Sequence, residues 1–452
     1  MAATSIDKSE RILVVGAGTF GLSTAFHLVE RGYNNVICMD RWEVPSKSSA
    51  GWDISKIART EYFNPIYTRI AHESLDAWRD VEPFASAKLF HQTGWLHMNP
   101  SDMSTAAAER FERGLENTRQ YGDGSQIEYL TDENAIKAKC SLLTGDLKGW
   151  RGIFNGNAGW VEAKRSMEVL GEYCVQHGVK FISGPSGVMA EFIRDPQTNA
   201  VIGVQAEDGT QHHADRIILS AGAWSESLLD FEGQVFSGAY ELAHIQLSEE
   251  ERERYSSLPV LHAPNKGYCF PPTQDGIFKI ASLTYTQTNY TTLNGRLVSV
   301  PRDRSLNPTD TLSEEGIAGC RKIAQACLPE LGDRPLVYSA MCWDTESIDF
   351  NWIVSPQYVW FHFELVSSVQ ASAIKFSPSS PSTLYIATAG SGHSFLVIGK
   401  YVCDCLEGKL PENLRETWRW RPDKVGDAPR VNRVDIKDLH GWRHDGKCEK
   451  QG

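Results

Sequence analysis

The chain of 452 residues has a formal net charge of −12 at pH 7, and 41% of its residues are hydrophobic, 23% charged and 10% aromatic. This ordinary globular composition excludes collagen-like, low-complexity and largely disordered chains. The acidic balance disfavours nucleic acid and membrane surfaces as partners, because their phosphates would repel it. The length is enough for a large core and about two to four domains.

The termini and the cysteines bear on where the protein works. No apolar run approaches the ~20 residues needed to cross a bilayer, and residues 1–10 are too polar for a secretory signal. The last residues carry no S-K-L address. The 10 cysteines include no CxxC pair, which is typical of reduced thiols and not of a zinc site or a disulfide framework. We therefore expect an intracellular, cytoplasmic protein with no bound metal.

The start of the chain predicts a dinucleotide-binding βαβ unit. Residues 11–15 form an apolar run typical of a buried parallel strand, and they lead into a G-x-G-x-x-G motif at 16–21. Apolar residues then recur at helical spacing up to Gly32, which is a suitable stop after a helix. Residues 36–39 predict a second strand, and Asp40 follows it.

Each part of this unit has a physical role. Gly16 permits the tight turn, Gly18 lets a pyrophosphate approach the backbone, and Gly21 lets helix and strand pack closely. The helix N-terminus faces the pyrophosphate charge, and Asp40 lies where a carboxylate would bind ribose hydroxyls. A glycine-rich surface turn is the alternative, but the complete order of strand, turn, helix, strand and acidic residue favours the dinucleotide site.

The kind of dinucleotide depends on a segment far downstream. Asp40 disfavours NADP but leaves both NAD and FAD open. Residues 214–220 predict a strand that ends in the small-residue turn Ala221-Gly222-Ala223-Trp224. Such a late strand is common where a flavin domain is assembled from distant segments, although any buried strand can end in this way.

Four further stretches carry a family resemblance. They are residues 48–62, 299–302, 341–343 and 390–395. With the glycine motif, they resemble segments of the D-amino-acid-oxidase-type flavoproteins, and most of all the branch of sarcosine oxidases and fructosyl amino acid oxidases (amadoriases). The resemblance covers nearly the whole chain.

The resemblance implies an α/β fold (α+β overall) in which a Rossmann-type FAD-binding domain is interleaved with a substrate domain of mostly antiparallel sheet. The FAD-binding domain would comprise residues 1–90, 150–230 and 338–452. The substrate domain would comprise residues 91–149 and 231–337. The chain itself shows alternating strand and helix patterns, which are consistent with an α/β fold.

The resemblance also implies roles for two positions far apart in the chain. Cys342 would carry FAD through an 8α thioether, whereas the alternative is a buried structural cysteine. Lys279, on a predicted strand, would lie under the flavin as the oxygen-activating lysine. Its ammonium would favour the negative charge that develops on O2; the alternative is a solvent-facing lysine.

Two cations and one turn complete the predicted catalytic site. Lys56 and Arg59 would share a face of a helical turn, and in the family these positions meet the flavin and the substrate carboxylate. The alternative is a basic face in water. The turn Gly392-His393-Ser394 would donate backbone N–H groups to the flavin pyrimidine, although His393 could equally be a packing residue. Arg419 or Arg421 could reach a substrate, with low specificity.

The complete set of predicted cofactor contacts combines the glycine motif with these later segments. It consists of Gly16, Ala17, Gly18, Thr19, Phe20, Gly21, Asp40, Arg41, Ser48, Ser49, Lys56, Val188, Ala221, Gly222, Trp224, Cys342, Gly392, His393 and Ser394.

The chain departs from the family in three places. About three residues are missing after Phe395, including a lysine that usually helps bind the substrate carboxylate, which leaves Arg59 as the main candidate cation. Leu283 stands where fructosyl amino acid oxidases have an acidic residue, so a fructosyl substrate is in doubt. Residues 357–377 interrupt an expected short connection, either as a retained intron or as an extra strand or lid.

The leading hypothesis is an FAD-dependent amine oxidase that acts on the C–N bond of a secondary amine or N-substituted amino acid. Its partners would be a small amine or amino acid and O2, and the products an imine and H2O2. We expect a monomer. The alternatives are a flavin dehydrogenase with another electron acceptor and a flavin-binding protein without turnover.

Overall fold

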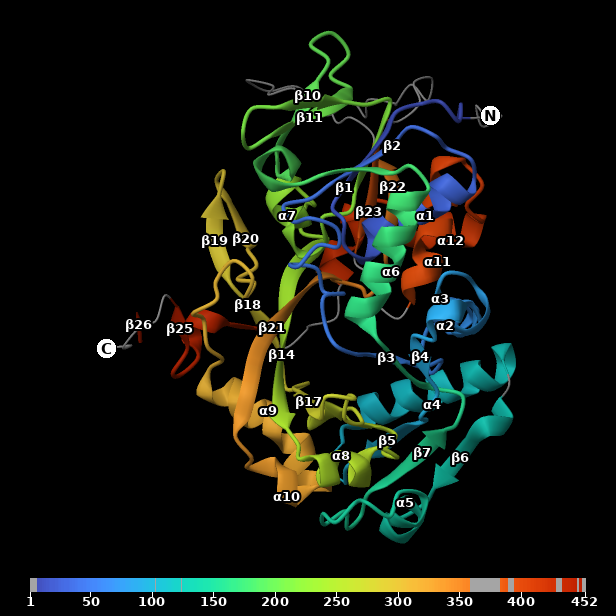
Figure 1. The fold of residues 1–452 in the computed structure, drawn as a ribbon, viewed down its shortest axis with the longest axis vertical. Helices are drawn as coiled ribbons and strands as arrows, with labels where there is room; N and C mark the ends of the chain where they lie inside the picture. The colour runs from blue at the N-terminus through green and yellow to red at the C-terminus, as the bar shows by residue number, and fades with distance from the viewer. Residues whose placement is uncertain are drawn as a thin grey trace.

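The computed structural model describes residues 6–101, 103–122, 124–357, 383–388, 394–427, 433–444 and 447–448. The expected insertion at 357–377 lies outside these residues apart from Gln357, and so do Gly392 and His393. Figure 1 shows two layered regions, one above the other, with long strands running between them.

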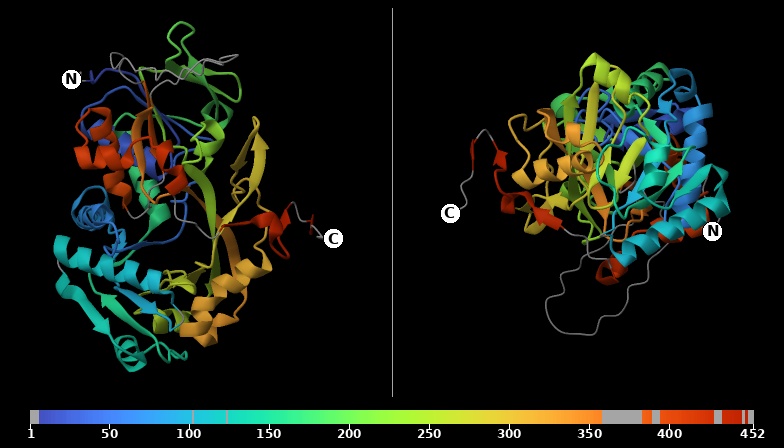
Figure 2. Two further views of the ribbon diagram at one scale, coloured as in Figure 1. Left: turned by 180° about the vertical axis from the view of Figure 1, so that it is seen from behind. Right: turned by 90° about the horizontal axis from the view of Figure 1, so that it is seen from below.

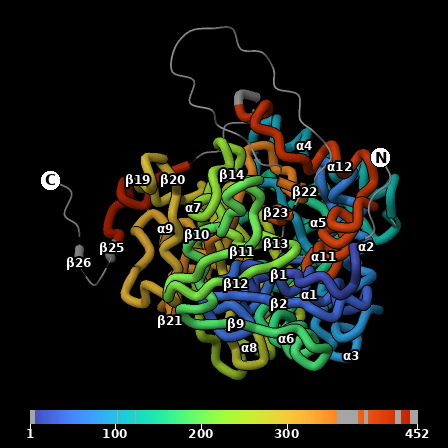
Figure 3. Tube along the Cα trace, turned by 90° about the horizontal axis from the view of Figure 1, so that it is seen from above, coloured from blue at the N-terminus to red at the C-terminus, as the bar shows by residue number. Residues whose placement is uncertain are grey.

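The upper region in Figure 1 is built on a mostly parallel sheet. Its strands lie in the order β22 (Ile353–Gln357), β23 (Leu384–Thr388), β13 (Arg216–Leu219), β1 (Ile12–Val15), β2 (Val36–Met39) and β9 (Lys180–Ile182). Figure 3 shows this order from above. The first two strands of the predicted βαβ unit are therefore confirmed as β1 and β2, which pair in parallel.

Both faces of this sheet are covered. Ile12 and Val14 pack in one core with the helices α1 (Thr19–Glu30), α6 (Ala163–Gln176) and α11 (Phe395–Leu406). Leu13 and Val15 pack in another core with the antiparallel strands β10 (Met189–Arg194) and β11 (Val201–Ala206), beside which β12 (Gln211–His213) lies. Successive residues of a strand face opposite sides, so a strand covered on both sides is apolar throughout.

A second, largely antiparallel sheet runs through the lower region. Its strands are β14 (Val235–Gln246), β21 (Leu336–Ser347), β17 (Ile277–Ala281), β16 (Gly267–Cys269), β15 (Val260–Ala263), β5 (Trp95–Asn99), β7 (Arg151–Asn155), β6 (Ile127–Leu130), β18 (Thr286–Thr288) and β24 (Arg433–Asp435). The long strands β14 and β21 pair along most of their length. Helix α9 (Glu314–Cys327) packs on β14, β16 and β17.

The remaining elements connect and cover these two sheets (Figure 2). They include β3 (Lys56–Ala58), β4 (Phe90–His91) and β8 (Gly159–Val161), which form a small sheet between the two regions. The others are α2 (Pro65–Asp80), α3 (Phe84–Ala87), α4 (Thr105–Tyr121), α5 (Glu133–Lys139), α7 (Ser225–Leu228), α8 (Glu249–Tyr255), α10 (Pro329–Gly332), α12 (Glu412–Trp418), β19 (Tyr290–Leu293), β20 (Arg296–Ser299), β25 (Arg443–His444) and β26 (Lys447–Cys448).

The predicted mixed α/β fold, with a parallel sheet and a largely antiparallel one, is confirmed. The segment boundaries at 90, 149, 230 and 337 stay a prediction. The strands β7, β21 and β24 fall wholly or mostly within segments assigned to the FAD-binding domain, yet they pair in the second sheet.

Candidate active site

The turn after β1 leaves no room for side chains at two of its glycines. Gly16 has a φ of +104°, and a Cβ there would lie 2.5 Å from the carbonyl oxygen of Ser220. A Cβ on Gly21 would lie 1.7 Å from the carbonyl oxygen of Gly16. The close packing of turn, helix and strand therefore requires both glycines.

Asp40 lies at the end of β2 and secures this turn. Its carboxylate accepts hydrogen bonds from the backbone N–H groups of Ala17 and Trp42, each at 2.9 Å. Burial raises the pKa of Asp40, and these amide donors oppose that shift. The carboxylate also lines the cavity described next.

A cavity of about 920 Å³ extends from the glycine turn to the second sheet. Of the predicted cofactor and catalytic residues, the following line it: Gly16, Gly18, Thr19, Phe20, Asp40, Arg41, Ser48, Ser49, Lys56, Arg59, Val188, Ala221, Gly222, Trp224 and Ser394. Ala17 and Gly21 belong to the turn but not to the lining: Ala17 donates its N–H to Asp40, and Gly21 packs against the backbone of Gly16. Lys279 and Cys342 lie outside the lining. Lys279 contacts the lining residue Phe270, with Nζ 4.9 Å from the ring centre, and Cys342 contacts the lining residue Lys56.

Lys56 does not lie on a helical turn, so this prediction is wrong. Residues 56–58 form the strand β3, which pairs with β8, and Arg59 follows directly. Both side chains still reach the cavity. The spacing of three residues between Lys56 and Arg59 is compatible with both a helical turn and a strand. The strand forms because residues 56–58 pair with residues 159–161, which are far away in the sequence.

A carboxylate lies between two buried ammonium groups beside the cavity. Asp53 Oδ2 is 2.5 Å from Lys279 Nζ and 3.1 Å from Lys56 Nζ, and Lys279 also donates to the carbonyl oxygen of Ser55 at 2.8 Å. The Lys279 side chain is 1% exposed. Burial alone would raise the pKa of Asp53, but the two ammonium groups outweigh it and lower that pKa. Burial lowers the pKa of Lys279, against the attraction of Asp53.

Cys342 on β21 lies next to this cluster. Lys56 Nζ lies 3.4 Å from its Sγ, within reach for donating a hydrogen bond. Burial raises the pKa of the Cys342 thiol to about 12, while the Lys56 ammonium opposes the shift. The nearby ammonium is the group that would stabilise a thiolate there.

The other end of the cavity combines a cation with aromatic rings. The Arg59 guanidinium lies 4.3 Å from the ring centre of Tyr62 and 5.1 Å from that of Trp95. Leu283 lines the cavity at the position where the fructosyl amino acid oxidases have an acidic residue. Arg110, exposed on α4, also lines it and pairs with no carboxylate among the described residues.

Sequence reasoning missed several residues of the site. They are Asp53, Glu61, His97, Arg110 and His262, and all but Asp53 line the cavity. Asp53 precedes Lys56 by three residues, a spacing that could have suggested an ion pair. The two histidines come from strands 165 positions apart, so no local pattern connects them.

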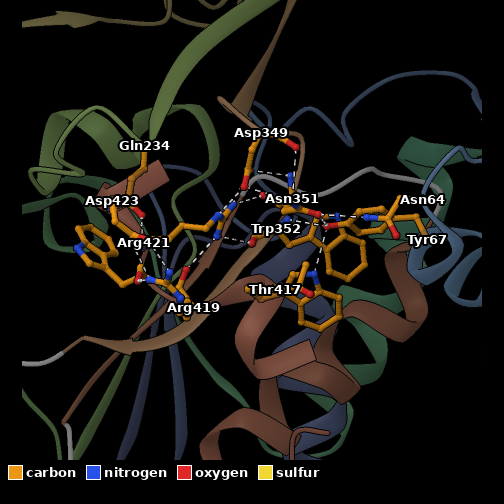
Figure 4. A network of polar contacts seen from close by, with 12 residues as sticks. Asn64, Tyr67, Gln234, Asp349, Asn351, Trp352, Thr417, Arg419, Arg421 and Asp423 are labelled. Carbon is orange, nitrogen blue, oxygen red and sulfur yellow. Dashed lines mark hydrogen bonds and ion pairs between the residues drawn. The ribbon is translucent and has the colours of Figure 1, made fainter. Parts of the chain in front are cut away.

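Arg419 and Arg421 do not line the cavity, which corrects the suggestion that either could reach a substrate there. The Arg421 guanidinium is paired with both carboxylate oxygens of Asp349, each at 2.7 Å, and donates to two backbone carbonyls near Trp352 (Figure 4). Arg419 pairs with Asp423 in the same figure. Arg421 therefore holds the segment after α12 against the residues that precede β22, whereas Arg419 pairs within its own segment.

The cavity fits the expected FAD. Buried hydroxyls of Thr345, Ser347 and Thr388 line it and have no hydrogen-bond partner among the described residues. A buried polar atom without a partner costs free energy, so a polar ligand in the cavity would satisfy these groups. The glycine turn at one end matches a pyrophosphate.

Two other possibilities have no support in the described part of the chain. No three His, Cys, Asp or Glu side chains gather there as a metal site. Likewise, none of its helices combines the length and the apolar character that a bilayer crossing requires.

Comparison with known proteins agrees with the geometry. A family model described as FAD dependent oxidoreductase matches residues 11–402. L-saccharopine oxidase of Schizosaccharomyces pombe is 30% identical over 436 residues, which cover 92% of this chain and 94% of that protein. Fructosyl peptide oxidase from E. terrenum superposes with a TM-score of 0.86 and 31% identity, covering 98% and 99% of the two chains. Amadoriase II from Aspergillus fumigatus superposes with a TM-score of 0.82 and 27% identity over 99% of both.

These matches span nearly the whole chain and confirm the predicted resemblance to the branch that includes the amadoriases. The glycine turn, the acidic end of β2 and the cavity between the two sheets are the features expected for the cofactor of that family. The chain therefore belongs to the family of FAD-dependent oxidoreductases.

Proposed function

We propose that this enzyme oxidises the C–N bond of a secondary amine or N-substituted amino acid, with O2 as the electron acceptor. The proposal depends on a single cavity that extends from the glycine turn to Arg59. The Lys279–Asp53–Lys56 cluster lies beside this cavity, and Lys56 lines it. The relatives named as saccharopine oxidase and fructosyl peptide oxidase support this substrate class.

The residues divide the work between binding and charge stabilisation. FAD, held by the glycine turn and Asp40, would supply the redox chemistry, which removes a hydride from the carbon next to the amine nitrogen and reduces O2 to H2O2. Arg59 binds a carboxylate of the substrate, while Trp95 and Phe270 in the cavity wall exclude water. Lys279 supplies a fixed ammonium for the negative charge that develops on oxygen. Water then hydrolyses the imine product.

The substrate is better described as an N-substituted amino acid than as a fructosyl compound. Leu283 cannot pair with a sugar-bearing ammonium, because it offers no charge. Arg59 and Arg110 both line the cavity and could each bind a carboxylate. A saccharopine-like amine with several carboxylates suits this pair.

A panel of amines tests the proposal. Purified holoenzyme is mixed with L-saccharopine, sarcosine, pipecolate and a fructosyl amino acid, first under nitrogen and then in air. We expect saccharopine or a similar amine to bleach the flavin under nitrogen and to produce H2O2 in air. Dye reduction without peroxide would indicate a dehydrogenase, and yellow protein that no amine bleaches would indicate a flavin-binding protein without turnover.

We also propose that Cys342 carries the flavin covalently, since it lies beside Lys56 at the cavity. After acid denaturation the yellow colour should stay with the polypeptide, and a tryptic peptide containing Cys342 should have the added flavin mass. Cys342→Ala should lose this adduct but keep some FAD through the glycine turn. Cys405→Ala, a half-buried thiol on α11, is the matched control. Release of all flavin from the wild-type protein would contradict the linkage.

The proposed compartment is the cytoplasm, and the proposed state is a monomer. None of the described cysteines is in a disulfide, which is typical of proteins kept in a reducing compartment. Fractionation of cells and light scattering of the purified holoenzyme test the two statements.

A further inference from the structure

Two histidines lie side by side in the cavity wall. His97 on β5 and His262 on β15 are paired residues of neighbouring parallel strands. Their rings stack with centres 4.8 Å apart, and their Nδ1 atoms are 2.7 Å apart. Both line the cavity. Because this pairing depends on two distant strands, it creates a polar feature that no sequence motif announces.

A chain of hydrogen bonds from Asn99 through His97 to His262 determines which ring nitrogens are protonated. His97 Nε2 lies 2.7 Å from Asn99 Oδ1. In this orientation of the Asn99 amide the oxygen accepts, and Nε2 carries the proton. A neutral imidazole has one N–H, so His97 Nδ1 must accept, and His262 Nδ1 must donate to it. The remaining nitrogen, His262 Nε2, then carries a lone pair and no proton.

The pair stays neutral at physiological pH. Burial, with a smaller contribution from Arg59, lowers the pKa of His97 to about 3, and the hydrogen bond to Asn99 opposes the shift. Burial also lowers the pKa of His262 well below its usual value, and both His97 and Arg59 add to the shift. Trp95 packs against the His262 ring and Phe111 stacks on the His97 ring, which adds apolar surface around the pair. The lone pair on His262 is therefore a permanent acceptor.

This acceptor lies near the carboxylate-binding cation. Arg59 and the His262 ring both pack on Trp95, at 5.1 Å and 5.5 Å from its ring centre. The hydrogen bond of His262 among the described residues is the one at Nδ1, and the ring lines the cavity. In an amino acid, one carbon separates the carboxylate from the amine nitrogen. A carboxylate on Arg59 therefore brings the amine of the same unit close to the pair.

We propose that His262 Nε2 accepts a hydrogen bond from the substrate amine whose carboxylate binds Arg59, and so selects amines that carry an N–H. His97 and Asn99 act through His262 as positioning residues. The inference rests on the proposed function and deepens it. It makes His262 a specificity-determining residue that accepts secondary amines and disfavours their tertiary, N-methylated analogues, which have no hydrogen to donate.

The proton positions are tested without turnover. Holoenzyme labelled with 15N-histidine is compared with the His262→Gln variant, whose spectrum lacks the His262 signals. We expect wild-type His262 to show a protonated Nδ1 and an unprotonated Nε2. Asn99→Leu should abolish this preference, and Asn99→Asp, which keeps an acceptor, should retain it. A wild-type His262 protonated at Nε2 would overturn the proposal.

Specificity is tested with L-saccharopine and its N-methyl derivative, or with a better amine from the panel and its N-methyl derivative. Flavin absorbance under nitrogen gives the affinity for each. His262→Phe should weaken binding of the N–H compound about 10–100-fold and leave the N-methyl compound unchanged. His262→Gln should recover part of the affinity. His212→Phe, on β12 outside the cavity lining, should change neither.

The outcomes separate the two hypotheses. Wild-type enzyme that no amine of the panel bleaches contradicts the proposed function. Wild-type enzyme that is bleached, with a His262→Phe variant that binds both compounds as the wild type does, overturns the role of His262 alone. Retained flavin in each variant shows that its cavity is intact.

Discussion

Asp53 is the residue on which the charge balance of the active site depends. It pairs with Lys279 and Lys56 together, and the Asp344 carboxylate also attracts the Lys56 ammonium. An unpaired buried charge is costly, and a paired one is tolerated when its hydrogen bonds are satisfied. Asp53 therefore favours the charged form of both lysines, and Lys279 depends on it for the ammonium that we propose acts on oxygen.

Lys279→Met should separate the two halves of turnover. The variant keeps a side chain of similar length and removes the ammonium. We expect anaerobic flavin reduction to change little and reoxidation by O2 to slow by about 100-fold or more, because one preorganised cation for a developing anion is worth about 3 kcal/mol. Stopped-flow absorbance measures each half separately. Lys180→Met, an exposed lysine on β9, is the control, and a Lys279→Met variant that reoxidises at the wild-type rate would show that this lysine is structural.

At the scale of elements, the contact between α1 and α11 joins the start of the chain to its last third. A Cβ on Gly399 would lie 2.1 Å from the carbonyl oxygen of Ser23, and the Gly399 N–H donates to Ser23 Oγ at 2.9 Å. The two helices therefore touch through backbone. This contact holds the glycine turn at the start of α1 against the segment that begins at Ser394.

Gly399→Ala should destabilise the protein, although alanine favours helices. In an open helix the change would stabilise by about 1 kcal/mol, whereas here the new methyl group meets backbone and should cost about 1–3 kcal/mol. Urea unfolding followed by tryptophan fluorescence measures the difference. The sign is diagnostic, since a stabilised Gly399→Ala variant would mean that the helices are further apart than the structure has them.

At the scale of the whole molecule, stability depends on buried groups that titrate between pH 5 and 7. His97 has a folded-state pKa of about 3, below its usual 6.5, so the unfolded chain binds more protons between these values. The free energy of unfolding therefore falls as the pH is lowered through 6.5. Glu226 and Glu241, whose pKa burial raises to about 7, act in the opposite direction.

A variant isolates the histidine contribution. For one such group the free energy of unfolding should fall by about 2 kcal/mol between pH 7 and pH 5. His97→Gln removes this group and leaves both glutamates in place. Its loss of stability over the same range should be smaller than that of the wild type by about that amount, as measured by urea unfolding at the two pH values. Equal losses would show that His97 is protonated or accessible to water in the folded protein.

The sequence by itself determined the local features of this protein. The βαβ unit at 11–40 could be predicted because its turn, helix and strands follow one another within 30 residues. Gly21 is required by a backbone contact inside that unit, whereas Gly16 also meets the backbone of Ser220 at the end of β13. The family resemblance predicted a mixed α/β architecture, and the structure has its two parts, a mostly parallel sheet and a largely antiparallel sheet.

Only the tertiary structure decided how distant side chains meet. Residues 56–58 form a strand because β8 pairs with them, although their spacing equally suited a helix. Asp53 meets Lys279 across 226 positions, and His97 meets His262 across 165. Local patterns cannot encode such contacts, because each depends on where two segments that are far apart in the sequence are placed in the fold. The chemistry of the substrate end of the cavity therefore became visible only with the fold.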